Sequence, residues 1–464
     1  MPVTATAPAR LTLLSVVEGV RNNHLPLAVV FLKKDQKGPS MKINTLYLGV
    51  TNDCNLKCTY CMRPKAAAYM DEDVARKAVQ WFVEQLPEEP TPNITFWGGE
   101  PCMNKTAVLA AINEIERLIP GKSTFTISTN GYDLPDELFD EIAFKSKRWA
   151  VQVSLDGKKE SHDKNRPSID GDSSFDRAIA TFKKLNGICN IALRATITPG
   201  NVHNLFEDMR YLRLLTPNFN VRPMFQASWK DKHYEGLRKG LLQYAQYEVE
   251  RVAAGDKPSK VAAHPFSSCG IQFSGMCGAG REMAYVDTAG NIWPCADHED
   301  LGRHLLGNID DGIDYITHSK RLFEELSIEN FIGCKQCTAI SCTTCHALNL
   351  GQTGCEVLPP EGYCRAMRIF GEFYAVLQTE LQKLGYYHEY KVPIRYTMFE
   401  DGSFSLLIKE GNKMIGRKYQ DINAATLDTL FRVTTLLERL KKDGEDRRDN
   451  PEHAGCACVC PAAD

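Results

Sequence analysis

Between residues 45 and 230, short apolar runs alternate with segments in which apolar residues recur every three or four positions. The runs predict strands buried on both faces, and the recurring positions predict amphipathic helices. The predicted strands span residues 45–51, 94–99, 124–130, 149–155, 191–198 and 220–226. Ala78 and Phe82 belong to one helical stripe, and Ser173 followed by Asp176 predicts the capped start of another helix.

Six strand–helix units in series predict a parallel, right-handed, barrel-like sheet. Because a full barrel has eight such units, we expect a partial (β/α)6 barrel with its active site at the carboxyl ends of the strands. The first predicted strand ends at residue 51 and is followed by Cys54, Cys58 and Cys61. These three cysteines are therefore expected at the functional edge of the barrel.

The rest of the chain divides by composition. A helix over 233–253 is predicted to leave the barrel, and nine cysteines between residues 269 and 364 indicate a second, cysteine-organised domain. A hairpin with Asp401-Gly402 at its turn and an amphipathic helix over 427–440 predict a small α+β module. The expected division is an N-terminal extension 1–44, the barrel 45–232, the cysteine-rich domain 233–386, the module 387–441 and a disordered tail 442–464.

Composition and charge narrow the class of protein. The chain has 43% hydrophobic and 24% charged residues, a net charge of −3 and a pI near 6.4. Such a balance favours folded domains and gives no basic surplus for nucleic acid or anionic lipid. The apolar runs at 11–17 and 25–32 fall short of the roughly 20 residues that span a bilayer, and no signal peptide is evident. We expect a cytoplasmic protein that is not in a membrane.

The cysteine content points to metal ligation. Seventeen cysteines, an odd number in a chain without an export signal, argue against a disulfide scaffold. A closed zinc site or a Cys₄ cluster uses four protein ligands. Three cysteines on one loop, with no histidine beside them, leave one iron of a [4Fe–4S] cluster without a protein ligand. That iron is a binding place for a substrate.

The spacing C-x3-C-x2-C, with Tyr60 before the last cysteine, resembles the hallmark of the radical S-adenosylmethionine (SAM) superfamily. The resemblance implies that Cys54, Cys58 and Cys61 hold a [4Fe–4S] cluster that binds SAM. It also implies that an electron from a reductant such as flavodoxin or ferredoxin cleaves SAM to a 5′-deoxyadenosyl radical. The alternative, three incidental thiols, is less favoured because further family-like elements follow in order.

Those further elements stand at later strand ends. Gly98, Gly99, Glu100 and Pro101 resemble the segment whose backbone receives the methionine amino group of SAM; Ser154, Asp156 and Gly157 resemble the SAM and ribose region. Arg194 is the candidate for the SAM carboxylate, and an ion pair that supports the barrel is an equal alternative for it. We interpret Asn130 and Asn201 as turn or cap residues, and Cys102 and Cys189 as core thiols.

The later cysteines resemble the SPASM extension of radical SAM enzymes, which holds two auxiliary [4Fe–4S] clusters. The resemblance assigns Cys269, Cys277, Cys295 and Cys345 to the first cluster, and Cys334, Cys337, Cys342 and Cys364 to the second. The central run is two residues shorter than the family pattern and Cys355 has no assigned role, so ligand exchange among Cys342, Cys345 and Cys355 stays open. Either cluster serves electron transfer or substrate binding, or it only braces the domain.

The usual task of the SPASM enzymes that this chain resembles is to modify a peptide or protein. The family includes anaerobic sulfatase-maturating enzymes and ribosomal-peptide maturases. The resemblance therefore implies a maturase that forms a thioether, a carbon–carbon crosslink or an oxidised product. Segments 1–44 and 387–441 are expected to grip a leader peptide by strand addition. Ala296 stands where the sulfatase-maturating branch has an aspartate. This difference weakens the prediction that the substrate is a sulfatase.

Two other functions stay open. One is radical SAM chemistry on a small metabolite, and the other is a non-catalytic iron–sulfur scaffold for electron transfer. In the tail, Cys456, Cys458 and Cys460 alternate along the chain, which would suit a metal or a substrate sulfur. An exposed tail of redox-sensitive thiols is the favoured interpretation.

Overall fold

The structure is a computed structural model. It describes residues 28–31, 42–87, 90–263, 278–314, 317–318, 321–326, 330–334, 342, 344–385, 394–398, 404–410 and 413–419. Within these ranges, no helix combines the length and the apolar run that crossing a bilayer would require.

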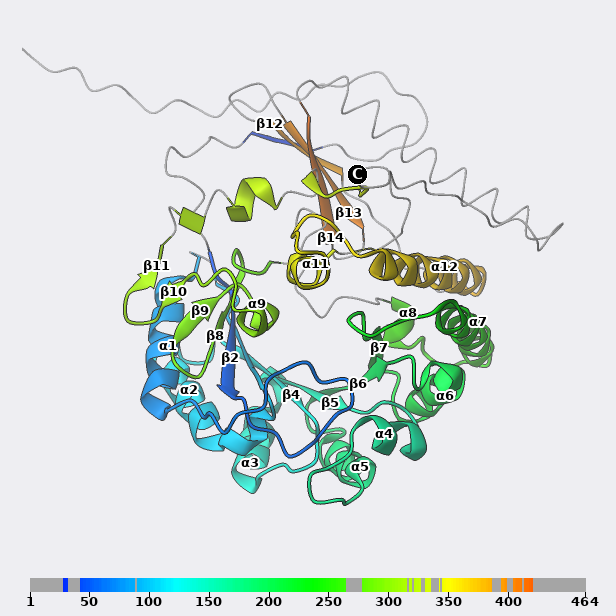
Figure 1. The fold of residues 1–464 in the computed structure, drawn as a ribbon, viewed down its shortest axis with the longest axis horizontal. Helices are drawn as coiled ribbons and strands as arrows, with labels where there is room; N and C mark the ends of the chain where they lie inside the picture. Colours follow the sequence, from blue (N-terminus) through cyan, green and yellow to red (C-terminus); the bar gives the residue numbers. More distant parts are fainter. Residues whose placement is uncertain are drawn as a thin grey trace, which may run out of the picture.

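Six parallel strands form the centre of the molecule, in chain order and at the predicted places. They are β2 (Thr45–Thr51), β3 (Asn93–Gly98), β4 (Thr124–Thr129), β5 (Trp149–Ser154), β6 (Asn190–Ile197) and β7 (Phe219–Pro223). Figure 1 shows that they make a curved, open sheet with the helices along its outer side. The predicted partial barrel is confirmed.

The helices that cover this sheet are α1 (Glu72–Glu84), α2 (Lys105–Leu118), α3 (Asp136–Phe144), α4 (Lys159–Asn165), α5 (Ser174–Leu185) and α6 (Leu205–Leu215). Their apolar faces and the outer faces of the strands make one core, with Phe82, Ile112 and Phe182 among its buried members. The Ser173 side chain caps α5 by accepting from the Asp176 N–H at 3.2 Å, as the sequence predicts.

The prediction that all six strands are buried on both faces is wrong for β4 to β7. In these strands, buried positions alternate with positions that are half-buried or exposed. The half-buried positions lie on the concave side, where Ser128 and Gln152 hydrogen-bond at 3.4 Å. An open barrel leaves this side accessible, so that it accommodates polar side chains.

The sheet continues beyond the predicted barrel. β8 (Met283–Val286) pairs in parallel with β2, and β9 (Asn291–Trp293), β10 (Gly307–Asn308) and β11 (Gly312–Ile313) follow by antiparallel pairing, which makes a ten-stranded sheet. β8 and β9 form a strand–turn–strand around Gly290. Gly49 allows this packing, because a Cβ there would lie 1.9 Å from the Tyr285 hydroxyl oxygen.

The helix after the barrel packs back onto it. α7 (Asp231–Ala253) contacts α6 and the long helix α12 (Glu361–Lys383), with α8 (Lys260–Ala263) beside β7. Leu237, Leu241 and Tyr244 are buried on one face of α7, and the Tyr244 ring packs edge-on against Phe219 at 5.9 Å. The prediction that this helix leaves the barrel is therefore wrong, because its apolar face covers the end of the sheet.

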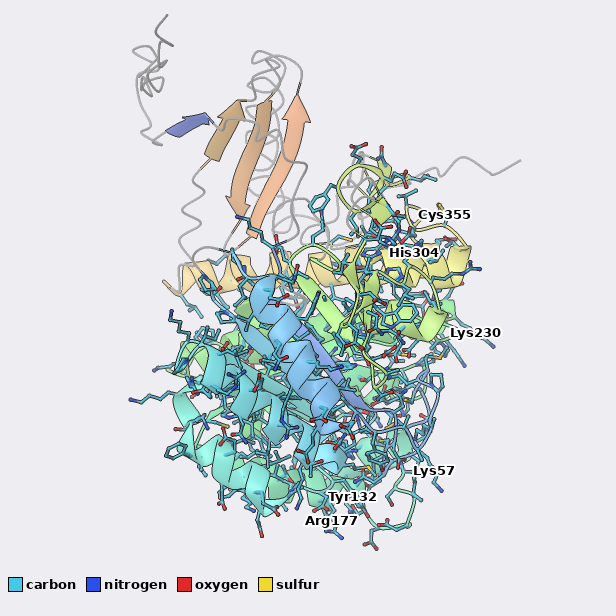
Figure 2. All side chains as sticks on the ribbon, turned by 90° about the vertical axis from the view of Figure 1, so that its left-hand side faces the viewer. Lys57, Tyr132, Arg177, Lys230, His304 and Cys355 are labelled. Atoms are coloured by element: carbon cyan, nitrogen blue, oxygen red, sulfur yellow. The ribbon has the colours of Figure 1, made fainter. Side chains whose placement is uncertain are left out.

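A separate four-stranded sheet has the order β1–β12–β13–β14. It consists of β1 (Ala28–Phe31), β12 (Ile394–Met398), β13 (Phe404–Glu410) and β14 (Lys413–Tyr419). β12 and β13 pair antiparallel, as the predicted hairpin requires, and β1 pairs with β12 in parallel. The predicted turn at Asp401-Gly402 lies outside the described residues. Figure 2 shows this sheet beyond α12, away from the barrel. The predicted helix over 427–440 and the cysteine tail lie outside the described residues.

Candidate active site

The loop after β2 carries the three predicted cluster cysteines. The Asp53 carboxylate accepts from the Cys54 N–H at 2.8 Å, and the Leu56 N–H donates to the Cys54 Sγ at 3.4 Å. Leu56 is buried and anchors the loop. Cys54 and Cys58 are half-buried, whereas Cys61 is exposed. The loop thus presents its thiols at a partly open site.

The loop thiols are soft donors of the kind that iron–sulfur clusters use. Burial raises the pKa of Cys54 to about 11 and also raises the pKa of Cys58, so that both stay protonated unless a metal binds them.

The glycine segment after β3 lies directly on the cysteine loop. The Gly99 N–H donates to the Thr51 carbonyl at 2.7 Å, and the Glu100 N–H donates to the Asp53 carbonyl at 2.8 Å. A Cβ at Gly98 would lie 2.1 Å from the Thr51 oxygen, and one at Gly99 would lie 2.1 Å from the Asp53 oxygen. Both positions need glycine because the two backbones touch.

Replacing Gly99 by alanine is expected to displace the cysteine loop and to lower the iron content of the loop cluster. The added Cβ meets a backbone oxygen at 2.1 Å, and such overpacking costs about 1–3 kcal/mol. Iron analysis and urea unfolding check the result. Gly200→Ala is the matched control, since its nearest atom is a side-chain oxygen at 3.4 Å. An equal loss of iron in both variants would contradict the contact proposed for Gly99.

Glu100 joins the ends of β3 and β4. Its carboxylate is 1% exposed and accepts from the Asn130 N–H at 2.6 Å, the Thr129 hydroxyl at 2.8 Å and the Cys102 N–H at 3.1 Å. Burial raises the pKa of Glu100, and these donors oppose that effect. Both carboxylate oxygens therefore hold the chain in place behind the glycine segment. Cys102 is buried, which confirms its interpretation as a core thiol.

Asn130 reaches the cysteine loop from the end of β4. Its Oδ1 accepts from the Tyr132 N–H at 2.8 Å, which is the predicted turn role. Its Nδ2 also donates to the Asn55 Oδ1 at 2.8 Å and to the Cys54 Sγ at 3.7 Å. The sequence gives no signal for this second contact, because it joins residues 76 positions apart. Asn201 makes only turn contacts near the end of β6, as predicted.

Asn130→Ala is expected to make the midpoint potential of the loop cluster more negative. Hydrogen bonds to cysteine sulfur stabilise the reduced, more negative cluster. A loss of about 1 kcal/mol corresponds to roughly 40 mV for a one-electron couple. An anaerobic redox titration followed by electron paramagnetic resonance measures the shift. Asn201→Ala should leave the potential unchanged, and an equal shift in both variants would contradict the role of the Asn130 contact.

Asp156, after β5, is the centre of a buried hydrogen-bond network. Its carboxylate accepts from the Tyr60 hydroxyl at 3.0 Å, the Asn165 Nδ2 at 3.3 Å, the Arg166 guanidinium at 3.0 Å and the Thr196 N–H at 2.8 Å. The Asp156 side chain is 0% exposed. The network therefore fixes the aromatic residue that precedes the last loop cysteine.

Arg166 extends this network toward the cysteines. Its guanidinium carbon lies 5.3 Å from the centre of the Tyr60 ring. Burial raises the pKa of Cys58, and the positive charge of Arg166 opposes that effect. No spacing rule connects Arg166 with the cysteine motif, so the sequence gives no signal for this contact.

Ser154 and Arg194, both candidate SAM contacts, are brought together. They are direct neighbours in the register of β5 and β6. The Arg194 guanidinium carbon lies 5.8 Å from the centre of the Trp97 ring in β3. Two strands separate β3 from β6, so this contact crosses the concave side of the sheet. Arg194 therefore points into the open barrel.

The helices that follow two of the predicted auxiliary ligands are in contact with each other. Cys295 directly precedes α9 (Ala296–Leu301), and Cys345 directly precedes α11 (His346–Thr353). The His298 Nε2 and the His346 Nδ1 are 2.8 Å apart, so the helices are in contact. Cys334, Cys342 and Cys364 are half-buried. Cys269, Cys277, Cys337, Cys456, Cys458 and Cys460 lie outside the described residues.

Arg63 connects the cysteine loop with α9. Its side chain is 14% exposed and forms ion pairs with Glu299 and, at 3.5 Å, with Asp300. It also donates to the Tyr285 hydroxyl in β8 at 3.1 Å. Because Arg63 stands two residues after Cys61, the loop is tied to the helix that starts after Cys295.

Comparison with known proteins gives relatives for most of the chain. Residues 48–210 match the family described as the Radical SAM superfamily. The chain is 24% identical over 372 residues to the cysteine-type anaerobic sulfatase-maturating enzyme of Clostridium perfringens (strain ATCC 13124), an alignment that covers 71% of this chain and 96% of that enzyme. It is 24% identical over 325 residues to mycofactocin maturase MftC of Mycolicibacterium smegmatis, covering 66% and 76%.

One further relative and one solved structure are also similar to this chain. GTP 3′,8-cyclase of Aeromonas hydrophila is 26% identical over 303 residues, covering 60% of this chain and 85% of the cyclase. The solved structure of anSMEcpe with bound AdoMet has a TM-score of 0.61 at 18% identity and covers 75% of this chain and 97% of that one. That likeness confirms the fold. The match to the Radical SAM superfamily covers the part of the chain that holds the cysteine loop and most of the barrel.

Proposed function

We propose that this protein is a radical SAM maturase that modifies a peptide or protein substrate. The observation that carries the proposal is the gathering of the glycine segment, Asn130, the Asp156 network and Arg194 around one three-cysteine loop. A reduced [4Fe–4S] cluster on Cys54, Cys58 and Cys61 would supply the electron that cleaves SAM to a 5′-deoxyadenosyl radical.

The residues around the loop receive SAM in this proposal. The backbone of residues 98–101 accepts the methionine amino group, and Arg194 pairs with the methionine carboxylate. Ser154 lies beside Arg194 in the sheet register and binds the ribose. Asp156 acts through Tyr60 and Arg166, because its own oxygens are occupied by protein donors.

The substrate class rests on the relatives. The enzymes of C. perfringens and M. smegmatis are named as maturing enzymes, which favours a peptide or protein here. Ala296, in the place of the aspartate of the sulfatase-maturating branch, argues against a sulfatase as the substrate. The product is a thioether, a carbon–carbon crosslink or an oxidised residue.

Two auxiliary [4Fe–4S] clusters complete the proposed cofactors. Cys295 and Cys345 would share the first cluster with Cys269 and Cys277, and the contact between α9 and α11 supports the pairing of Cys295 with Cys345. The second cluster would take Cys334, Cys337, Cys342 and Cys364. Arg63 bridges the SAM loop and α9, which supports a substrate cleft between the two parts.

The outer sheet is the proposed place for a leader peptide. β1 comes from the N-terminal extension and joins the hairpin of the C-terminal module in one sheet. An extended leader would add a strand at the edge formed by β1 or β14. We place the enzyme in the cytoplasm, with a flavodoxin or ferredoxin as its reductant.

Anaerobic reconstitution followed by SAM and a strong reductant tests the function. We expect about twelve irons per chain from three clusters, and 5′-deoxyadenosine as a product. A short precursor peptide encoded beside the gene should then change in mass. A chain that binds zinc in place of iron and leaves SAM intact would refute the proposal.

A small-metabolite substrate is the second candidate. The similarity to GTP 3′,8-cyclase, whose name states a nucleotide substrate, favours it. Retained SAM cleavage with no modification of any neighbouring precursor peptide would favour this candidate over the maturase.

A further inference from the structure

Three metal-ligating side chains converge in the cysteine-rich part of the chain. They are His298 in α9, His346 at the start of α11 and Glu356 after α11. The two histidines are 0% and 1% exposed. Within the described part of the chain, these three are the group whose ligand atoms all lie within 4.8 Å of one another. Figure 2 labels two residues that adjoin this group, His304 and Cys355.

The separations suit one small ion. The His298 Nε2 lies 2.8 Å from the His346 Nδ1, and the Glu356 Oε1 lies 3.9 Å from the first atom and 3.4 Å from the second. Tetrahedral zinc, with bonds of about 2.0–2.1 Å to imidazole nitrogen, places its ligands roughly 3.3–3.4 Å apart. The observed distances lie on both sides of that value, so shifts of a few tenths of an ångström would complete the site.

Two imidazoles and one carboxylate are a ligand set that zinc uses in proteins.

Two residues outside the proposed ligand set hold the Glu356 carboxylate in place. The Arg321 guanidinium contacts both oxygens of Glu356, and the His304 Nε2 lies 3.3 Å from the Oε2. Such outer contacts orient metal-binding carboxylates. The charge of Arg321 opposes a nearby cation. Each carboxylate oxygen has two lone pairs, however, so the Oε1 can accept from Arg321 and still bind an ion.

We propose that His298, His346 and Glu356 bind a divalent ion of the zinc type, separate from the iron–sulfur clusters. The ion would lock α9 to α11, the helices that begin directly after Cys295 and Cys345. This site goes beyond the proposed function and does not depend on SAM cleavage.

The test uses the full-length chain, purified anaerobically with zinc in the medium. We expect one zinc per chain in addition to iron. X-ray absorption at the zinc edge should show nitrogen and oxygen neighbours at about 2.0–2.1 Å, and not sulfur at about 2.3 Å. His346→Gln and Glu356→Gln should each lose the zinc. His203→Gln, which changes an exposed histidine before α6 in the barrel, should keep it.

Three outcomes would overturn the site. They are the absence of zinc, zinc with sulfur neighbours, and equal zinc in the wild type, His346→Gln and Glu356→Gln. Iron content and SAM cleavage are measured on the same samples. A protein with zinc and no SAM cleavage would refute the proposed function while supporting this site. A protein that cleaves SAM and holds no zinc would refute this site while supporting the proposed function.

Discussion

Cys58→Ala is expected to abolish formation of 5′-deoxyadenosine. Cys58 is one of three thiols on a single loop, and a cluster held there by two cysteines would lack the ligand set that binds SAM. Iron should fall from about twelve to about eight per chain, because the two proposed auxiliary clusters would use other ligands. Iron analysis and chromatography of the SAM reaction under anaerobic conditions measure both values.

Cys189→Ala is the matched control for this loss. Cys189 is half-buried like Cys58, but it lies next to the start of β6, at the opposite end of the strands from the cysteine loop. It should keep full iron and full SAM cleavage. If Cys58→Ala retained cleavage, the assignment of the loop would be wrong.

Asp156→Asn is expected to destabilise the fold by about 3–5 kcal/mol, because it leaves the buried charge of Arg166 without its partner. The Arg166 side chain is 9% exposed and the Asp156 side chain is 0% exposed, so water does not replace the lost ion pair. The Tyr60 hydroxyl also loses a charged acceptor. Urea unfolding of the variant and the wild type measures the difference, and SAM cleavage should fall with it.

Asp176→Asn removes a carboxylate from an exposed ion pair with Lys159 in the same region. Exposed pairs contribute little, so this control should unfold close to the wild type. Equal behaviour of the two variants would show that the Asp156 network does not support the loop.

The barrel could be predicted from the sequence because its strands and helices are local patterns. The apolar runs and stripes between residues 45 and 226 specify their own elements, and short connections fix the strand order. Partners far apart in the chain leave no such signal. The pairing of β8 with β2 and the return of α7 onto the barrel depend on surfaces that form only after folding.

The same difference between local patterns and distant contacts applies to the candidate site. Cys54, Cys58 and Cys61, by their spacing, and the glycine segment after a strand could be predicted as site residues because both resemble motifs of a known family. The contact of Asn130 with the cysteine loop, the role of Arg166 and the group around Glu356 leave no signal in the sequence, because each depends on a contact with a distant segment. Their residue types are common at turns and in ion pairs, so sequence alone does not distinguish them.

The place of β2 in the sheet has a consequence for synthesis of the chain. Its neighbours are β3, which is made soon after it, and β8, which is made much later. Until β8 emerges from the ribosome, β2 is an apolar edge strand, and such edges pair with other chains. A chain cut after residue 263 should therefore aggregate, as light scattering would detect, because the strand that leads to the cysteine loop is protected last.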